Sequence, residues 1–142
     1  MTEILFLHSV PDRHQATVAW LEESSQERKV AVLLPDSSAL MRFEQLLWSH
    51  NPTSFLPHCR ADSALAERTS IVLGCDLAGF RDSDCLVNLL NQVPDNFSRF
   101  KELIEVIGKG DSDKSSGRDR FRHYRECGFT IDSQDYSNAG RA

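Results

Sequence analysis

The chain has 142 residues, which is long enough for one domain with a hydrophobic core and short for two. Apolar residues make up 40% of it and charged residues 26%, proportions typical of a globular protein in water, and no apolar run approaches the roughly 20 residues that cross a bilayer. The formal net charge of −5 argues against nonspecific binding of nucleic acid by the whole surface.

The N-terminal residues 1–8 lack a basic region and a small-residue cleavage site, so they predict a strand and not a secretory signal. We therefore expect a cytoplasmic protein with no membrane partner. The four cysteines show no C-x-x-C spacing, and we expect free, buried thiols. The pair His58-Cys59 is the only local suggestion of a metal, and zinc needs two more ligands that the sequence does not place nearby. We expect neither a metal nor a cofactor.

Apolar runs alternate along the chain with segments of helical period, which predicts an α/β fold with a largely parallel sheet. We expect strands at residues 4–8, 29–34, 70–73, 85–90 and 103–107. We expect helices after Pro11-Asp12, after Pro35-Asp36, and from Asp111 or Ser112 to about Cys127, with a short helix or turn at 94–100. Residues 1–131 are predicted to form a single three-layer domain, Rossmann-like but lacking nucleotide-binding motifs. Residues 132–142 are predicted to be a polar, flexible C-terminal tail.

One segment allows an enzymatic interpretation. Residues 108–115 (GKGDSDKS) lie between a predicted strand and a predicted helix and nearly fit the phosphate-loop pattern G-x-x-x-x-G-K-S. Asp113 stands where the second glycine belongs, and a carboxylate there would face the phosphates. A nucleotide-binding α/β enzyme that uses this degenerate loop remains the alternative hypothesis.

The last predicted helix carries a basic face. Residues 109–125 contain six basic and three acidic residues, a local charge of +3 in an acidic chain. At about 100° per residue, one narrow sector of this helix holds Lys114, Arg118, Phe121 and Arg125, with Arg122 beside it. Guanidinium groups next to an aromatic ring suit a ligand that has an apolar ring and a carboxylate. The same charges could instead be a solvated helix face, or could bind single-stranded DNA directly.

Two blocks of sequence resemble one family. Residues 47–58 (LWSHNPTSFLPH) resemble the segment L-W-x-x-x-P-x-S-F-(V/L)-P-H of the chi-subunit family of bacterial DNA polymerase III. Residues 118–129 (RDRFRHYRECGF) resemble its helix R-x-R-(Y/F)-(K/R)-x-Y-R-x-x-G-F. The first turns of the last predicted helix depart from the family at Ser115-Ser116-Gly117, where members tend to have apolar helix formers.

The resemblance implies a non-catalytic replication adaptor in an α/β fold. Chi subunits pair with the psi subunit of the clamp-loader complex and bind the acidic C-terminal tail of single-stranded DNA-binding protein, which ends in a phenylalanine carboxylate. Contact with nucleic acid would be mainly indirect. Carried over by position, Arg118 would hold the carboxylate, Lys114 and Arg122 would supply positive charge, and Phe121 would be a wall for the ring. Trp48, Phe55 and Ile107 would complete the pocket, with Arg125 nearby on the helix.

Overall fold

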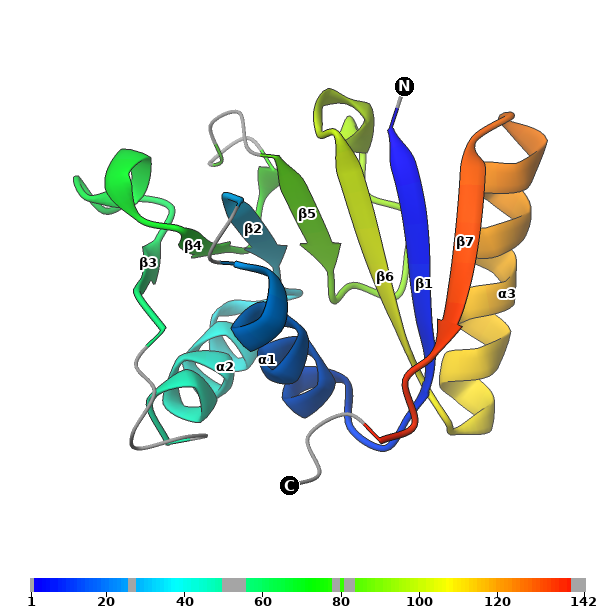
Figure 1. Ribbon diagram of the computed structural model, residues 1–142, viewed down its shortest axis with the longest axis horizontal. Coiled ribbons are helices and arrows are strands. Elements are labelled where there is room, and N and C mark those ends of the chain that lie inside the picture. The colour runs from blue at the N-terminus through cyan, green and yellow to red at the C-terminus, as the bar shows by residue number, and fades with distance from the viewer. Residues whose placement is uncertain (1, 26–27, 50–55, 78–79, 81–83, 139–142) are drawn as a thin grey trace.

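The computed structural model describes residues 2–25, 28–49, 56–77, 80 and 84–138, and within them it shows one sheet flanked by helices (Figure 1). The sheet has seven strands in the order β3-β4-β2-β5-β6-β1-β7, and each neighbouring pair is parallel. The strands are β1 (Glu3–Val10), β2 (Val30–Leu33), β3 (His58–Arg60), β4 (Ile71–Gly74), β5 (Cys85–Asn88), β6 (Glu102–Gly108) and β7 (Thr130–Asp135). The predicted α/β class with a mainly parallel sheet is confirmed.

The central strands are buried on both faces. All four residues of β2, of β4 and of β5 are buried, and the sequences VAVL, IVLG and CLVN are correspondingly apolar almost throughout. Strands of parallel sheets are typically apolar on both faces, because the crossover connections between them place helices over both sides of the sheet. The five strands that we predicted from apolar runs are all present, within one or two residues of their expected ends.

Two helices cover one face of the sheet and a third covers the other (Figure 1). Helices α1 (Arg13–Ser24) and α2 (Ser37–Ser49) share a core with the strands, in which Leu21 and Phe43 are fully buried. Helix α3 (Asp111–Glu126) belongs to a second core through Tyr124. Two cores separated by one sheet give the three layers that we expected.

Local signals determine where the helices begin. The Asp12 side chain caps α1 by accepting from the backbone NH of Gln15 at 2.9 Å, and Asp36 accepts from the NH of Ala39 at 2.8 Å at the start of α2. Helix α3 differs from our prediction, because its N-cap is Gly110, which has no side chain to cap with. Asp111 is the first helical residue, where a carboxylate stabilises the helix dipole.

The C-terminal part of the domain contains a strand that the sequence did not predict. After α3, Gly128 has a φ of +84°, the left-handed conformation that ends many helices and that glycine adopts without steric cost. The chain then forms β7, which pairs with β1 in register from Glu3 with Thr130 to His8 with Asp135. Residues 132–135, which we expected in a flexible tail, are therefore part of the sheet.

The cysteines are free, as expected, but they are not uniformly buried. Cys85 is fully buried in β5, whereas Cys75 and Cys127 are exposed and Cys59 is partly buried. The prediction of buried thiols is thus wrong for the two exposed residues, because both lie just past the end of an element, at the surface. None of the helices in the described ranges is long and apolar enough to span a bilayer.

Candidate functional site

A pocket of about 270 Å³ lies beside the N-terminal half of α3. Its lining comes from four elements, because β1 lies between β6 and β7 in the sheet and α3 packs over them. The lining residues are Phe6, His8 and Ser9 from β1, Ile107 from β6, Lys114, Gly117, Arg118 and Phe121 from α3, and Ser133 from β7.

The inner part of the pocket is apolar. Phe6 and Ile107 are buried, with exposed fractions of 4% and 6%, and Phe121 is partly buried above them. The rings of Phe6 and Phe121 meet edge to face, with centroids 5.3 Å apart. A third aromatic ring, from a ligand, could make similar edge-to-face or stacked contacts with these two rings inside the pocket.

The outer part of the pocket is cationic. Lys114 and Arg118 are one turn apart on α3 and both are exposed. Among the described residues that line the pocket, none is Asp or Glu. A guanidinium group can bind both oxygens of a carboxylate, and an ammonium group adds positive charge without that geometry. The pocket therefore suits an anionic ligand with an apolar group.

A bulge at the end of β1 forms the wall opposite α3. The pairing of β1 with β6 shifts register between Leu7 and Val10. Within the bulge, Ser9 has a φ of +65°, which is uncommon for a residue other than glycine. The Ser9 hydroxyl lies 2.9 Å from Nδ1 of His8, and both residues line the pocket. Backbone strain of this kind is often found at binding sites.

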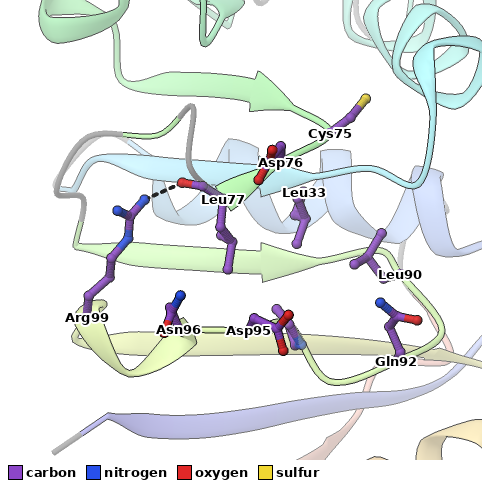
Figure 2. Close-up of a pocket in the computed structure, with 10 residues that line it drawn as sticks. Leu33, Cys75, Asp76, Leu77, Leu90, Gln92, Asp95, Asn96 and Arg99 are labelled. Carbon is purple, nitrogen blue, oxygen red and sulfur yellow. Dashed lines mark hydrogen bonds between the residues drawn. The ribbon is translucent and has the colours of Figure 1, made fainter.

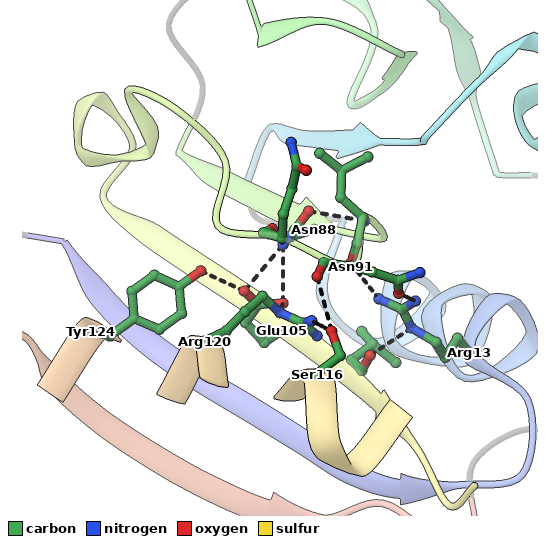
Figure 3. A network of polar contacts seen from close by, with 10 residues as sticks. Arg13, Asn88, Asn91, Glu105, Ser116, Arg120 and Tyr124 are labelled. Atoms are coloured by element: carbon green, nitrogen blue, oxygen red, sulfur yellow. Dashed lines mark hydrogen bonds and ion pairs between the residues drawn. The ribbon is translucent and has the colours of Figure 1, made fainter. Parts of the chain in front are cut away.

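The other flank of α3 is fixed to the sheet by a buried polar network (Figure 3). The Glu105 carboxylate of β6 accepts from Arg120 Nε at 3.1 Å, from the Tyr124 hydroxyl at 2.5 Å and from Asn88 Nδ2 at 3.1 Å. Arg120 also donates to the Ser116 hydroxyl. Because these contacts run from Ser116 to Tyr124, about two turns of α3, they set the position from which Lys114 and Arg118 face the pocket.

Burial shifts the pKa values of this network. Desolvation raises the pKa of Glu105, while Arg120 and the donors from Tyr124 and Asn88 act in the opposite direction. Burial and the adjacent Glu105 carboxylate raise the pKa of Tyr124 far above its ordinary value, so the hydroxyl stays protonated as a donor. Each buried polar group of this network has its hydrogen-bonding partners, so the network holds the structure together. It affects the pocket by fixing the position of α3.

The structure brings together four of the eight predicted site residues: Lys114, Arg118, Phe121 and Ile107. Arg122 and Arg125 are exposed on α3 outside the lining, and Arg125 is about one turn beyond Phe121. Phe55 lies outside the described residues.

Trp48 does not approach the pocket. It is at the end of α2, which packs with α1 on the opposite face of the sheet from α3 (Figure 1). There it is 65% exposed, and its ring meets His58 edge to face with centroids 5.4 Å apart. Sequence reasoning also missed Phe6, His8, Ser9 and Ser133, which only the strand order places beside α3.

The segment that resembles a phosphate loop has a different geometry. Only Lys109 and Gly110 separate β6 from α3, and the NH of Lys114 donates to the carbonyl of Gly110 at 3.0 Å inside the helix. The Asp113 carboxylate also folds back over Gly108, with Oδ2 in the space that a Cβ on Gly108 would need. The Lys114 amide is thus bonded inside the helix, and the Asp113 carboxylate occupies the space beside Gly108, where it would repel a phosphate.

Two other cavities are less suited to an anion. One of about 320 Å³ lies beyond the ends of β2, β4 and β5, and Asp76 and Asp95 line it (Figure 2). Arg99, the one cation among its described lining residues, donates to the carbonyl oxygens of Leu77 and Phe80. The other, of about 640 Å³, lies on the far flank of α3, where the Arg120 charge is paired with Glu105. Within the described ranges, no group of three or more His, Cys, Asp or Glu residues could hold a metal ion.

Comparison with known proteins gives one consistent result. Residues 1–132 match the family model described as "DNA polymerase III chi subunit, HolC". Among curated proteins, the chain is 24% identical over 109 residues to the DNA polymerase III subunit chi of Haemophilus influenzae, which covers 76% of each chain. It is 26% identical over 106 residues to that of Pseudomonas aeruginosa and 23% identical over 107 residues to that of Escherichia coli, each covering 75% of this chain and 73% of the relative.

Proposed function

The chain belongs to the family of DNA polymerase III chi subunits and is thus a replication accessory subunit, and we propose that it acts as a non-catalytic adaptor. In this proposal it captures the acidic C-terminal tail of single-stranded DNA-binding protein and links it, through the psi subunit, to the clamp loader. Its contact with nucleic acid is then mainly indirect, and it works in the cytoplasm, where replication takes place.

One observation carries the proposal: two cations stand at the mouth of a pocket whose inner part is aromatic and aliphatic. A tail that ends in phenylalanine offers a ring and a carboxylate on the same residue. Arg118 would bind the carboxylate, while Phe6, Ile107 and Phe121 would enclose the ring. Lys114 would attract the acidic residue that precedes the phenylalanine.

The remaining cations of α3 extend the same charge along the helix. Arg122 and Arg125 are exposed outside the pocket, so they cannot enclose the terminal residue. They would instead strengthen the positive field that draws the upstream aspartates of the tail. Trp48 lies on the opposite face of the sheet, and we leave it out of the proposed tail site.

The proposal is tested by fluorescence anisotropy with a labelled acidic peptide that ends in Asp-Phe. The free-acid peptide should bind, and the same peptide with an amidated C-terminus should bind at least tenfold more weakly, since it loses the charge that Arg118 pairs with. Binding of the free acid should weaken as salt rises, because salt screens the exposed cations.

Equal binding of the free-acid and amidated peptides would show that the C-terminal carboxylate is not recognised, which would contradict the proposed role of Arg118. A labelled single-stranded oligonucleotide serves as the second probe. Tighter binding of the oligonucleotide than of the peptide would favour direct contact with DNA, and the adaptor role would have to be abandoned.

A further inference from the structure

Gly117 lies on the side of α3 that faces Ile107 of β6. It is buried, and a Cβ built on it would lie 2.8 Å from Cδ1 and 3.0 Å from Cγ2 of Ile107. Both distances are shorter than carbon atoms approach without strain. The side chain of Ile107 therefore occupies the space that any residue larger than glycine would need.

Helix propensity makes a glycine here unexpected. Inside a helix, glycine is less favourable than alanine because it loses more backbone freedom on folding. The φ of Gly117 is not in the left-handed region, so the backbone does not require glycine. The contact with Ile107 is the structural feature that requires it.

This contact is also part of the pocket, because Gly117 and Ile107 both line it. An apolar cavity of about 150 Å³ holds a benzene molecule. The pocket of about 270 Å³ thus has room for a phenyl ring. If a Cβ at position 117 pushed the end of the Ile107 side chain into the pocket, that side chain would occupy the space that the ring needs.

We infer that Gly117 is a specificity-determining residue, whose missing side chain lets Ile107 lie against α3 and keeps the pocket deep enough for an aromatic C-terminal residue. The inference rests on the proposed function and adds how the site selects its ligand. Replacement of Gly117 by alanine turns Ile107 toward the pocket, which it already borders. The ring is then excluded, while Lys114 and Arg118 still attract the carboxylate.

The test compares three acidic peptides that end in Phe, Leu or Ala, each with a free carboxylate, on four forms of the full chain. Wild type should bind the Phe peptide at least tenfold more tightly than the Ala peptide. Gly117→Ala should reduce this ratio to about threefold or less, mainly through weaker binding of the Phe peptide. The double variant Gly117→Ala/Ile107→Val removes Cδ1, the closest atom, and should recover part of the preference for Phe.

Ser115→Ala is the matched control, since it adds an alanine to the same helix at an exposed position outside this pocket. It should keep the wild-type preference. Thermal unfolding of all variants checks that each is folded, and a loss of fold would weaken binding of all three peptides, not the ratio between them.

The proposed function and the role of Gly117 are contradicted by different results. If wild type prefers the Phe peptide and Gly117→Ala shows the same preference, Gly117 does not determine specificity, and the proposed function stands. If wild type binds none of the three peptides at low salt, the proposed function and the role of Gly117 are both wrong.

Discussion

The Arg120 guanidinium and the Glu105 carboxylate form an ion pair of 3.1 Å in which the two side chains are only 3% and 0% exposed (Figure 3). Such a pair joins α3 to β6 in the interior of the domain. Because arginine stays charged at all accessible pH values, the loss of Glu105 would leave a buried charge without its partner.

Glu105→Gln should therefore lower the free energy of unfolding by about 3–5 kcal/mol, measured by urea denaturation. Glu102→Gln is the control on the same strand, because Glu102 pairs with Arg28 at 2.6 Å while both side chains are about one-third exposed. That surface pair should contribute only about 0.2–1 kcal/mol. Equal losses for the two substitutions would show that burial does not govern the strength of these pairs.

The stability of the domain should fall as the pH drops below neutrality, in part because of His14. Its ring packs edge to face on Phe43 at 5.5 Å, and burial is the main cause that lowers its pKa. The unfolded chain then takes up the proton at a higher pH than the folded chain does. The stability linked to His14 is thus complete above the unfolded pKa and is lost as the pH falls toward the folded pKa.

His14→Gln removes this titration, so the fall in unfolding free energy between pH 7.5 and pH 5.5 should be smaller in the variant than in wild type. Urea denaturation at the two pH values measures the difference. An unchanged pH dependence in His14→Gln would mean that other groups account for the whole effect.

Arg118→Ala should weaken binding of the acidic Asp-Phe peptide by about ten- to a hundredfold, because it removes a charge-assisted pair with the carboxylate. Arg118→Lys should recover part of the loss, since an ammonium group keeps the charge without the planar fork. Trp48→Ala should bind the peptide as wild type does, because Trp48 is on the other face of the sheet. A tenfold loss with Trp48→Ala would contradict the location of the pocket.

Gly128→Ala should cost about 1 kcal/mol in unfolding free energy, because φ at this position is +84° and a Cβ makes the left-handed conformation unfavourable. Apart from Gly128 and its two chain neighbours, none of the described residues has a heavy atom within 4 Å of the added Cβ, so the cost is conformational and not a clash. Gly128→Asn should cost less, since asparagine tolerates this region. Thermal or urea unfolding that ranks Asn below Ala would refute the explanation.

Much of the fold could be predicted because burial leaves a pattern in the sequence. Strand β2 is apolar along its length, and Gly117 and Tyr124 lie on the buried face of α3. Strand β7 was missed because it is an edge strand with mostly exposed, polar side chains, TIDSQD. Its backbone bonds to β1 leave no hydrophobic signal to read.

Residue spacing predicted the candidate site only where its residues share one element, and Ile107 of β6 was added by the family resemblance. Helical spacing grouped Lys114, Arg118 and Phe121, which the pocket also brings together. Strand order is a long-range property, so nothing local pointed to His8 or Ser133. The family motif placed Trp48 in the same site as the α3 residues, but a motif does not indicate which face of the sheet α2 covers.

Phe6 and Ser133 line the same pocket although they come from opposite ends of the described chain. Proteins are synthesised from the N-terminus, so β7 leaves the ribosome after β1, β6 and α3. A nascent or truncated chain that ends before β7 can display the cations of α3, but it lacks the side of the pocket that Ser133 forms. Under the proposed function, such an unfinished chain would compete poorly for the peptide tail.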